Sequence, residues 1–251
     1  MRPPEPVIDI RNLTKVYGGS RKPALDGVNL LIEEGMFFGL LGPNGAGKTT
    51  MIRILCGLLS PTAGKVKIGG FSLSGHLPMI RKIIGVVPQE IALYPSLTAS
   101  ENLSVFGGIC GMKGNALRTR MDELLHLFGL YKNRKMQVGR YSGGMKRRLN
   151  LIAGMLHDPR ILFLDEPTVG VDVQSKNVIV ENLLELNRKG TTIVYTSHYL
   201  EEAENLCSYL AIIDEGRVIT KGTLADIRKA YDAGTRLEDI FLALTGKNLR
   251  D

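Results

Sequence analysis

The chain contains, at residues 42–49, the stretch Gly42-Pro43-Asn44-Gly45-Ala46-Gly47-Lys48-Thr49. It matches the pattern G-x-x-x-x-G-K-[ST], which is typical of a loop that binds the phosphates of a nucleoside triphosphate. The apolar run at residues 36–41 precedes it and predicts a buried strand. Residues 50–59 have the apolar spacing of a helix, and Ser60-Pro61 predicts where that helix stops. Strand, loop and helix in this order predict a phosphate-binding unit of α/β type.

The residue types in this stretch explain how it would bind phosphate. Gly42, Gly45 and Gly47 carry no Cβ, so the backbone can bend tightly and bring its N–H groups close to phosphate oxygens. The helix that follows directs its positive end at the same anion. Lys48 supplies a charge for the β- and γ-phosphates, and the Thr49 hydroxyl is a candidate Mg²⁺ ligand. The alternative, a glycine-rich turn before an ordinary helix, leaves the Lys-Thr pair unexplained.

Length and composition set limits on the class of protein. The chain has 251 residues, of which 44% are hydrophobic and 23% charged, as expected for a globular protein with a substantial core. No apolar run approaches the ~18 residues of a membrane-spanning helix, and the Pro-rich start has no signal-peptide core. Three scattered cysteines, Cys56, Cys110 and Cys207, lack metal-ligand spacing, so we expect reduced, cytosolic and mostly buried thiols.

The net charge of +7 admits several kinds of partner. Basic residues are spread along the chain, and their local concentrations are not interleaved with aromatic residues as in a nucleic-acid platform. We therefore expect mostly solvated surface and no nucleic-acid partner, with a protein or membrane face as the remaining alternative.

Strands and helices alternate along most of the chain. Two-faced strands are predicted at residues 7–13, 24–32 and 65–70, so the first part mixes antiparallel strands with the phosphate-binding unit. After a buried strand at 83–88, helices are expected at 98–110, 113–128 and 143–156, which makes residues 90–158 a mainly helical insertion. Strands then return at 160–165, 191–196 and 209–214, separated by helices at 175–189 and 199–205. This alternation predicts a parallel sheet with crossover helices, and short helices at 223–230 and 237–244 close the chain.

A pair of acids ends one of the predicted buried strands. Ile161-Leu162-Phe163-Leu164 is followed directly by Asp165 and Glu166. Ligands of parallel α/β sheets bind at the carboxyl ends of the strands, so we expect Asp165 beside the phosphate loop, holding Mg²⁺. Glu166, one residue further on, is placed to orient or deprotonate an attacking water. The alternative is an exposed acidic turn.

A second candidate anion-binding end lies at Tyr141-Ser142-Gly143-Gly144-Met145-Lys146. Ser-Gly-Gly before a helix offers N–H groups and a hydroxyl to an anion. Read alone, it is equally an ordinary helix N-cap. Because one loop already holds the nucleotide, a second such end needs an explanation, and a second copy of the chain arranged head to tail supplies one.

With these motifs, residues 7–230 resemble the nucleotide-binding subunit of an ATP-binding cassette (ABC) transporter. The loop at residues 42–49 matches that family's Walker A motif, residues 161–166 match Walker B, and residues 141–145 match the signature motif. Further matches are Gln89 at the Q-loop, Val169-Gly170-Val171-Asp172 at the D-loop, His198 at the switch histidine and Tyr17 at the aromatic that stacks on adenine.

The resemblance implies a P-loop NTPase fold. It implies an α/β cassette with a RecA-like parallel sheet core, an N-terminal antiparallel β subdomain and an inserted helical subdomain. We expect the ATP-binding domain to span residues 1–230, with the helical subdomain at about 90–158 and a C-terminal helical tail at 231–251.

The resemblance also assigns roles to residues. Two ATPs would lie in a head-to-tail dimer, each between one subunit's Walker A and the other's signature motif. Glu166, His198 and Gln89 would be catalytic, and Thr49, Gln89 and Asp165 would hold Mg²⁺. The expected ATP contacts are Tyr17, Gly42, Pro43, Asn44, Gly45, Ala46, Gly47, Lys48, Thr49, Thr50, Ser142, Gly143 and Gly144. Without the resemblance, Tyr17 could be an ordinary core aromatic. Likewise, His198 could be a histidine with only a structural role.

Two departures from the family pattern bear on the subfamily. The common signature is Leu-Ser-Gly-Gly-Gln, whereas Tyr141 and Met145 flank Ser-Gly-Gly here, so a contact by the missing Gln with ribose or phosphate is lost. This variant, followed by Lys146-Arg147-Arg148, and the tail at 237–246 are similar to ABC-2 type export subunits. An importer is the weaker reading.

We therefore predict an ATPase subunit that powers export through a separate membrane permease, at the cytoplasmic face of the membrane. A homodimer is the expected pairing of cassettes, and the helical insertion, with Gln89 through Glu101, would contact the permease. The alternatives are a soluble ABC-type ATPase acting on ribosomes, DNA or a protein complex, and a phosphotransferase using the same loop.

Overall fold

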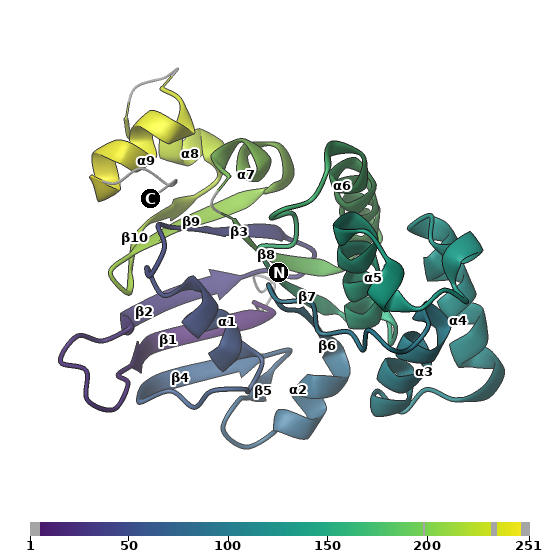
Figure 1. The fold of residues 1–251 in the computed structure, drawn as a ribbon. Helices are drawn as coiled ribbons and strands as arrows, with labels where there is room; N and C mark the ends of the chain where they lie inside the picture. The colour runs from purple at the N-terminus through teal and green to yellow at the C-terminus, as the bar shows by residue number, and fades with distance from the viewer. Residues whose placement is uncertain (1–5, 198, 232–234, 247–251) are drawn as a thin grey trace. The chain divides into compact units, whose positions relative to one another are not determined.

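The computed structural model describes residues 6–197, 199–231 and 235–246. The chain divides into two compact units (Figure 1). Unit 1 comprises residues 1–81 and 192–251, and unit 2 comprises residues 82–191.

Unit 1 contains an antiparallel sheet made from the first part of the chain. Its strands lie in the order β2-β1-β4-β5. They are β1 (Ile8–Lys15), β2 (Leu25–Ile32), β4 (Ala63–Ile68) and β5 (Phe71–Ser72). Along β2, buried Leu25, Val28, Leu30 and Ile32 face the core, which is the alternation expected of a sheet with one covered face.

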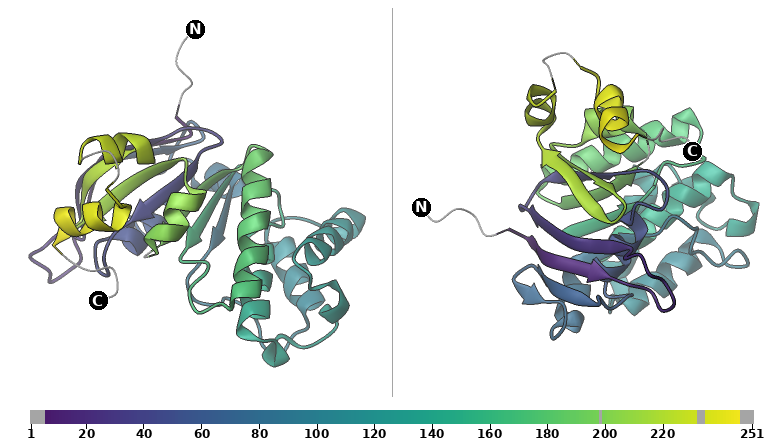
Figure 2. Two further views of the ribbon diagram at one scale, coloured as in Figure 1. Left: turned by 90° about the horizontal axis from the view of Figure 1, so that it is seen from above. Right: turned by 90° about the vertical axis from the view of Figure 1, so that its left-hand side faces the viewer.

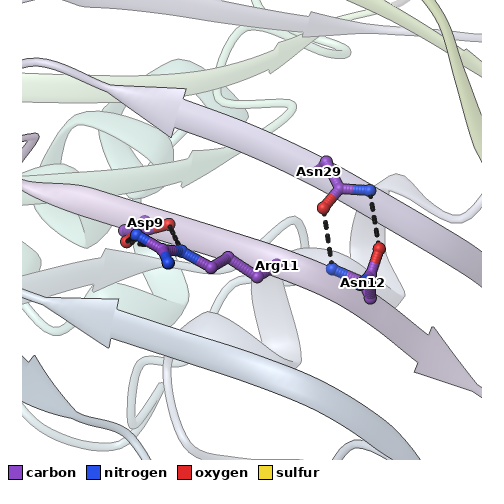
Figure 3. A network of polar contacts seen from close by, with 4 residues as sticks. All are labelled: Asp9, Arg11, Asn12 and Asn29. Atoms are coloured by element: carbon purple, nitrogen blue, oxygen red, sulfur yellow. Dashed lines mark hydrogen bonds and ion pairs between the residues drawn. The ribbon is translucent and has the colours of Figure 1, made fainter.

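A β-bulge in β1 is stabilised by side chains of the same sheet. Asn12 has a left-handed backbone (φ 48°) where the register of β1 with β2 shifts. The Asn12 N–H donates to Asn29 Oδ1 at 2.9 Å, and Asn29 Nδ2 donates to Asn12 Oδ1 at 3.0 Å (Figure 3). Just before the bulge in the same strand, Arg11 Nη2 forms an ion pair with Asp9 Oδ2 at 2.8 Å. The bulge therefore keeps its backbone N–H satisfied although it leaves the ladder.

The second set of strands in unit 1 surrounds β3 (Phe37–Leu41). It pairs in parallel with β8 (Thr192–Ser197) on one side and with β9 (Tyr209–Asp214) on the other. All residues of β3 and β8 are buried, which agrees with the apolar sequence of β3 and with the apolar centre of β8 at Ile193–Tyr195, although β8 also buries Thr192, Thr196 and Ser197. β10 (Arg217–Gly222) returns antiparallel to β9.

The helices that belong to the unit 1 segments lie around these strands. α1 (Lys48–Leu55) follows β3 directly, and α7 (Leu200–Leu206) packs on β3 and β8. α8 (Leu224–Lys229) contacts β10, and α9 (Leu237–Thr245) contacts α7 (Figure 2). α2 (Leu77–Ile83) bridges the sequence boundary of the two units.

Unit 2 combines two parallel strands with a group of helices. β6 (Ile84–Val87) pairs in parallel with β7 (Ile161–Asp165). The helices are α3 (Ala99–Ile109), α4 (Gly114–Leu127), α5 (Gly143–Met155) and α6 (Val173–Arg188), with 3₁₀ turns at Tyr131–Asn133 and Val138–Arg140. α5 contacts β6, α3, α4 and α6, so it is the central helix of this unit.

Some expectations from the sequence differ from the structure. α1 ends at Leu55 rather than near residue 59, because Gly57 adopts a left-handed φ of 67°. The strand β10 and the short elements α2 and β5 were not predicted, since their segments are half exposed and lack a clear apolar period. All three cysteines are free thiols, but only Cys56 and Cys207 are buried and Cys110 is exposed.

None of the helices within the described residues has both the length and the apolar character needed to cross a bilayer.

Candidate functional site: a phosphate loop and a buried catalytic pair

The phosphate loop of unit 1 is shaped by its backbone. Gly47 is the N-cap of α1 with φ 108°, and no side chain caps the helix there. A Cβ on Gly47 would lie 2.5 Å from the Ala24 carbonyl oxygen, and one on Gly42 would lie 2.2 Å from that of Ile213. The N–H of Gly216 in the β9–β10 turn donates to Ala46 O at 3.0 Å. The loop is thus enclosed by distant backbone, and only glycine fits at its two ends.

Lys48 brings a buried positive charge to this loop. Its side chain is 6% exposed, and its Nζ donates to Gly42 O at 2.7 Å and Pro43 O at 3.1 Å. Both acceptors are loop carbonyls, so the ammonium lies over the loop rather than in solvent. A buried cation beside uncapped helix N–H groups is an arrangement that favours an anion. The residues predicted to bind phosphate, Gly42 to Thr49, are therefore brought together in this unit.

Tyr17 lies next to the same helix end. Its hydroxyl is 3.2 Å from the Thr50 hydroxyl, and Lys15 Nζ is 5.4 Å from the ring centroid. The residue is 41% exposed, so the alternative of an ordinary core aromatic is wrong. Tyr17 is therefore an exposed aromatic residue beside the first turn of α1, where a planar ligand can reach it. Its stacking on adenine stays a prediction.

The acidic pair of unit 2 is buried at the end of β7. Asp165 is 5% exposed and Glu166 is 7% exposed, so the alternative of an exposed acidic turn is wrong. Glu166 has φ 49°, an uncommon left-handed conformation for a residue with a side chain. Such a conformation costs energy and persists where neighbouring contacts fix it, a condition often met at functional sites.

Gln89 is in direct contact with this acid. Its Nε2 donates to Glu166 Oε2 at 3.2 Å. Gln89 follows β6 and Glu166 follows β7, so the parallel pairing of these strands brings the two side chains to one edge. Two of the residues predicted to be catalytic therefore meet in unit 2.

The predicted second anion-binding end is the N-terminus of α5. Ser142 is its N-cap, and the Ser142 hydroxyl accepts the N–H of Met145 at 3.2 Å. A Cβ on Gly144 would lie 2.5 Å from Asp172 Oδ2 and 2.2 Å from the Ser175 hydroxyl, whereas Gly143 has open space around it. The ordinary N-cap is present, and the exposed Ser142 and Gly143 leave the helix end open to a ligand.

Tyr141 takes a structural role before this helix. Its ring is buried, and its hydroxyl donates to Asn133 O at 3.0 Å. Burial raises the pKa of the Tyr141 hydroxyl. A tyrosine where the family has leucine therefore keeps the apolar packing and adds one hydrogen bond. Met145 is half buried and offers no amide, so the contact of the missing glutamine is not replaced by this side chain.

Two expectations lie outside what the structure tests. His198 is not among the described residues. The phosphate loop belongs to unit 1 and the acidic pair to unit 2, so the expectation that Asp165 lies beside the loop stays a prediction.

The oxygen donors predicted for Mg²⁺ suit that ion chemically. Thr49 offers a hydroxyl, Asp165 a buried carboxylate and Gln89 an amide oxygen, and hard oxygen donors are what Mg²⁺ prefers. The described residues contain no cluster of three or more His, Cys, Asp or Glu that would hold a metal without a nucleotide.

Sequence reasoning missed two residues of this site, Arg147 and Asn150. Both are buried on α5, and both hydrogen-bond to the segment that carries Gln89. The available signal was the position of Arg147 four residues before buried Leu151, which puts a cation on the covered face of the helix.

Fold and site together define a nucleotide-binding protein with a phosphate loop and a buried acidic pair. The profile of the ABC transporter family matches residues 25–169. The chain belongs to the ABC transporter family.

Curated relatives agree over nearly the whole chain. The linearmycin resistance ATP-binding protein LnrL of Bacillus subtilis (strain 168) is 43% identical over 96% of this chain and 76% of the relative. The daunorubicin resistance ATP-binding protein DrrA3 of Streptomyces coeruleorubidus is 40% identical over 96% of this chain and 75% of the relative. The Nod factor export ATP-binding protein I of Ralstonia nicotianae is 42% identical over 86% of this chain and 67% of the relative. The predicted resemblance to ATP-binding subunits of the ABC-2 exporter type is confirmed.

Solved structures agree as well. An ATP-binding subunit of an ABC transporter superposes with a TM-score of 0.87 at 29% identity, covering 95% of this chain and 99% of that one. A dimeric ATP-binding cassette in a post-hydrolysis state, bound to ADP and Pi, gives 0.79 at 30% identity, covering 86% and 98%. The predicted α/β cassette fold is confirmed, and the chain is an ATP-binding, ATP-hydrolysing subunit of exporter type.

Proposed function

We propose that this chain powers export by a separate membrane permease, with ATP bound between two cassettes in a head-to-tail dimer. The observation that supports the dimer is the presence in one chain of two helix N-termini that begin at glycine-rich segments, at Gly47 and at Ser142. One ATP occupies the loop of its own chain, and the Ser142–Gly144 end contacts the γ-phosphate of the ATP held by the partner. The dimeric structure of a similar cassette bound to ADP and Pi supports the pairing of two cassettes.

In the proposed mechanism, the Lys48 ammonium binds the β- and γ-phosphates and α1 directs its N–H groups to them. Thr49, Asp165 and Gln89 would hold Mg²⁺, which neutralises phosphate charge when it is bound. Glu166 accepts the proton of the attacking water, and its contact with Gln89 keeps the carboxylate directed (3.2 Å). Tyr17 stacks on adenine, and His198 hydrogen-bonds the γ-phosphate.

ATP binding would close the dimer, and hydrolysis would reopen it. The permease is driven to the extent that ATP binds the closed state more tightly than the open one. On this view the cassette is peripheral, held at the cytoplasmic face of the membrane by the permease.

Unit 2 offers an apolar surface that supports permease docking. Ile91 and Tyr94 follow Gln89 and are 40% and 51% exposed, and Ile109 on α3 is 74% exposed. The centroid of the Tyr94 ring lies 6.3 Å from the centroid of the Phe106 ring, and Phe106 is on α3. Because Ile91 and Tyr94 follow Gln89 closely in the chain, a permease helix that contacts them would act on the segment that carries Gln89.

The test is copurification from native membranes, with the associated chains identified by mass spectrometry and ATPase measured on the same sample. We expect a polytopic membrane protein together with vanadate-sensitive ATPase. Recovery of ribosomes, DNA or a soluble complex without any membrane chain would contradict the export proposal and favour the soluble ABC-type ATPase. Transfer of labelled γ-phosphate to a metabolite in place of water would contradict hydrolysis.

A further inference from the structure

Arg147 is a buried cation for which neither the signature motif nor the Walker motifs assign a role. It lies one turn inside α5, counted from the N-cap Ser142, and is 5% exposed. Removing a guanidinium from water is costly unless its N–H groups find acceptors. The position of these acceptors therefore indicates what the side chain is for.

The acceptors are backbone carbonyls at the ends of two neighbouring strands. Arg147 Nη1 donates to Gln89 O at 2.7 Å and to Pro88 O at 3.2 Å, and Nη2 donates to Glu166 O at 3.0 Å. The first two carbonyls follow β6 and the third follows β7. One planar guanidinium thus fixes the spacing of both segments, which a flexible ammonium cannot do.

The two segments carry the side chains that meet in the catalytic pair. Gln89 Nε2 donates to Glu166 Oε2 at 3.2 Å, so backbone and side-chain bonds close a ring through Arg147, Gln89 and Glu166. Glu166 has the left-handed φ of 49°, and the Arg147 bond to its carbonyl is one of the contacts that hold this conformation.

Asn150 extends the same attachment one turn along α5. It is 3% exposed, accepts the Ala92 N–H on Oδ1 at 3.2 Å, and donates from Nδ2 to Pro88 O at 3.4 Å. The segment after β6 is therefore tied to α5 at two successive positions of one helix face.

We infer that Arg147 is a positioning residue for ATP hydrolysis, which ties Gln89 and Glu166 to the helix that begins at the signature motif. Displacement of α5 then moves the catalytic pair with it. The inference rests on the proposed roles of Glu166 and Gln89 and goes beyond them by naming the group that sets their separation.

The test compares Arg147→Met with wild-type full-length chain, using Arg120→Met as the matched control. Arg120 is a partly buried arginine of α4 in unit 2, and its ion-pair partners are Asp158 at 3.0 Å and Glu123 at 3.6 Å rather than the segments that carry Gln89 and Glu166. We expect Arg147→Met to lower kcat by about 10- to 100-fold with the ATP dissociation constant within about threefold. Arg120→Met should keep kcat within about twofold and lower Tm only slightly, because its partner Asp158 is exposed to solvent.

A double-mutant cycle with Glu166→Gln separates positioning from general destabilisation. In single-turnover assays, Arg147→Met should reduce the residual rate of the Glu166→Gln chain by less than about twofold, because the group it positions is already gone. A full 10- to 100-fold further loss, or a kcat like wild type in Arg147→Met alone, would overturn the inference.

Arg147→Lys covers the case in which the methionine variant does not fold. It keeps the charge but not the planar fork, so kcat should still fall by about tenfold at a near-normal Tm. A lysine variant with wild-type kcat would overturn the inference. Failure of the proposed function looks different: the wild-type chain would not hydrolyse ATP, or Glu166→Gln would hydrolyse it at the wild-type rate.

Discussion

The phosphate loop of unit 1 and the catalytic segment of unit 2 are built by different means. The loop is held by backbone, with glycine at both ends and the Gly216 N–H bonded to Ala46 O. The catalytic segment is held by side chains of α5, above all by the guanidinium of Arg147. A loop held by backbone contacts is sensitive to substitutions of its own residues. A segment held by side chains of another element can also be disturbed by substitutions in that element, here α5.

The largest effect is expected at the catalytic carboxylate. Glu166→Gln should lower kcat by about 10²- to 10⁴-fold, because the amide cannot accept the proton of the attacking water. The dissociation constant for ATP should stay within about threefold, since the phosphate loop is intact. Steady-state hydrolysis and equilibrium binding of a fluorescent ATP analogue measure the two quantities. Turnover at the wild-type rate would show that Glu166 is not the general base.

A smaller effect, on binding itself, is expected at Lys48. Lys48→Ala removes a buried charge from the loop and should weaken ATP binding by about 10- to 100-fold, the range of a charge-assisted hydrogen bond. Lys67→Ala, an exposed lysine of β4 in the same unit, is the control and should bind normally. Equal affinities of the two variants would show that the loop binds through its backbone alone.

The loop glycines should differ in how strongly substitution by alanine destabilises the protein. Gly47→Ala meets the Ala24 carbonyl and has φ 108°, so it should lower the free energy of unfolding by about 2–4 kcal/mol. Gly45→Ala has φ 77° but open space, so only the strain of about 1–2 kcal/mol applies. Urea unfolding at neutral pH tests this order. If both substitutions lower the free energy of unfolding equally, the positive φ alone explains the need for glycine, and the close approach of the Ala24 carbonyl does not add to it.

The smallest effect concerns pH and the cap of α6. The Asp172 carboxylate accepts the Ser175 N–H at 2.8 Å, and this bond lowers the pKa of Asp172. A lowered folded-state pKa stabilises the protein above the unfolded value of about 4, and the contribution is lost as the pH falls through the folded pKa. Asp172→Asn keeps the cap without the charge. The stability difference between wild type and Asp172→Asn should therefore shrink between neutral pH and about pH 3 in urea titrations. If the stability difference between wild type and Asp172→Asn does not change with pH, the charge of Asp172 does not contribute to the stability of the helix cap.

The contrast between the two regions also explains what the sequence could predict. The phosphate loop is a contiguous pattern whose glycines, lysine and threonine each have a local reason, so its position and its helix were predictable. The apolar strand before Asp165 and Glu166 predicted where these acids lie in the chain, but an exposed acidic turn remained an alternative until the structure showed that both are buried. The roles of Arg147 and Asn150 depend on contacts across about 20 to 60 residues of sequence, which no local pattern records.

Boundaries and weak elements were the other failures. β10 alternates exposed and half-buried residues at an edge, so its apolar signal is faint. The helix after the loop was predicted too long because its apolar spacing continues past Gly57, whereas the backbone of that glycine turns left-handed. The division of the cassette into residues 1–230 and a tail stays a prediction.

The pairing of β3 has a consequence for how the chain is made on the ribosome. β3 is synthesised early, yet its partners β8 and β9 begin at Thr192 and Tyr209, and the turn that holds the loop lies at Gly216. A nascent chain of ~150 residues therefore contains the apolar strand β3 without either of its partner strands. Contacts between segments so distant in sequence also form slowly. The nucleotide loop can reach its final form only after most of the polypeptide has left the exit tunnel. Synthesis that stalls before β8 would leave β3 without either partner strand and so exposed to aggregation.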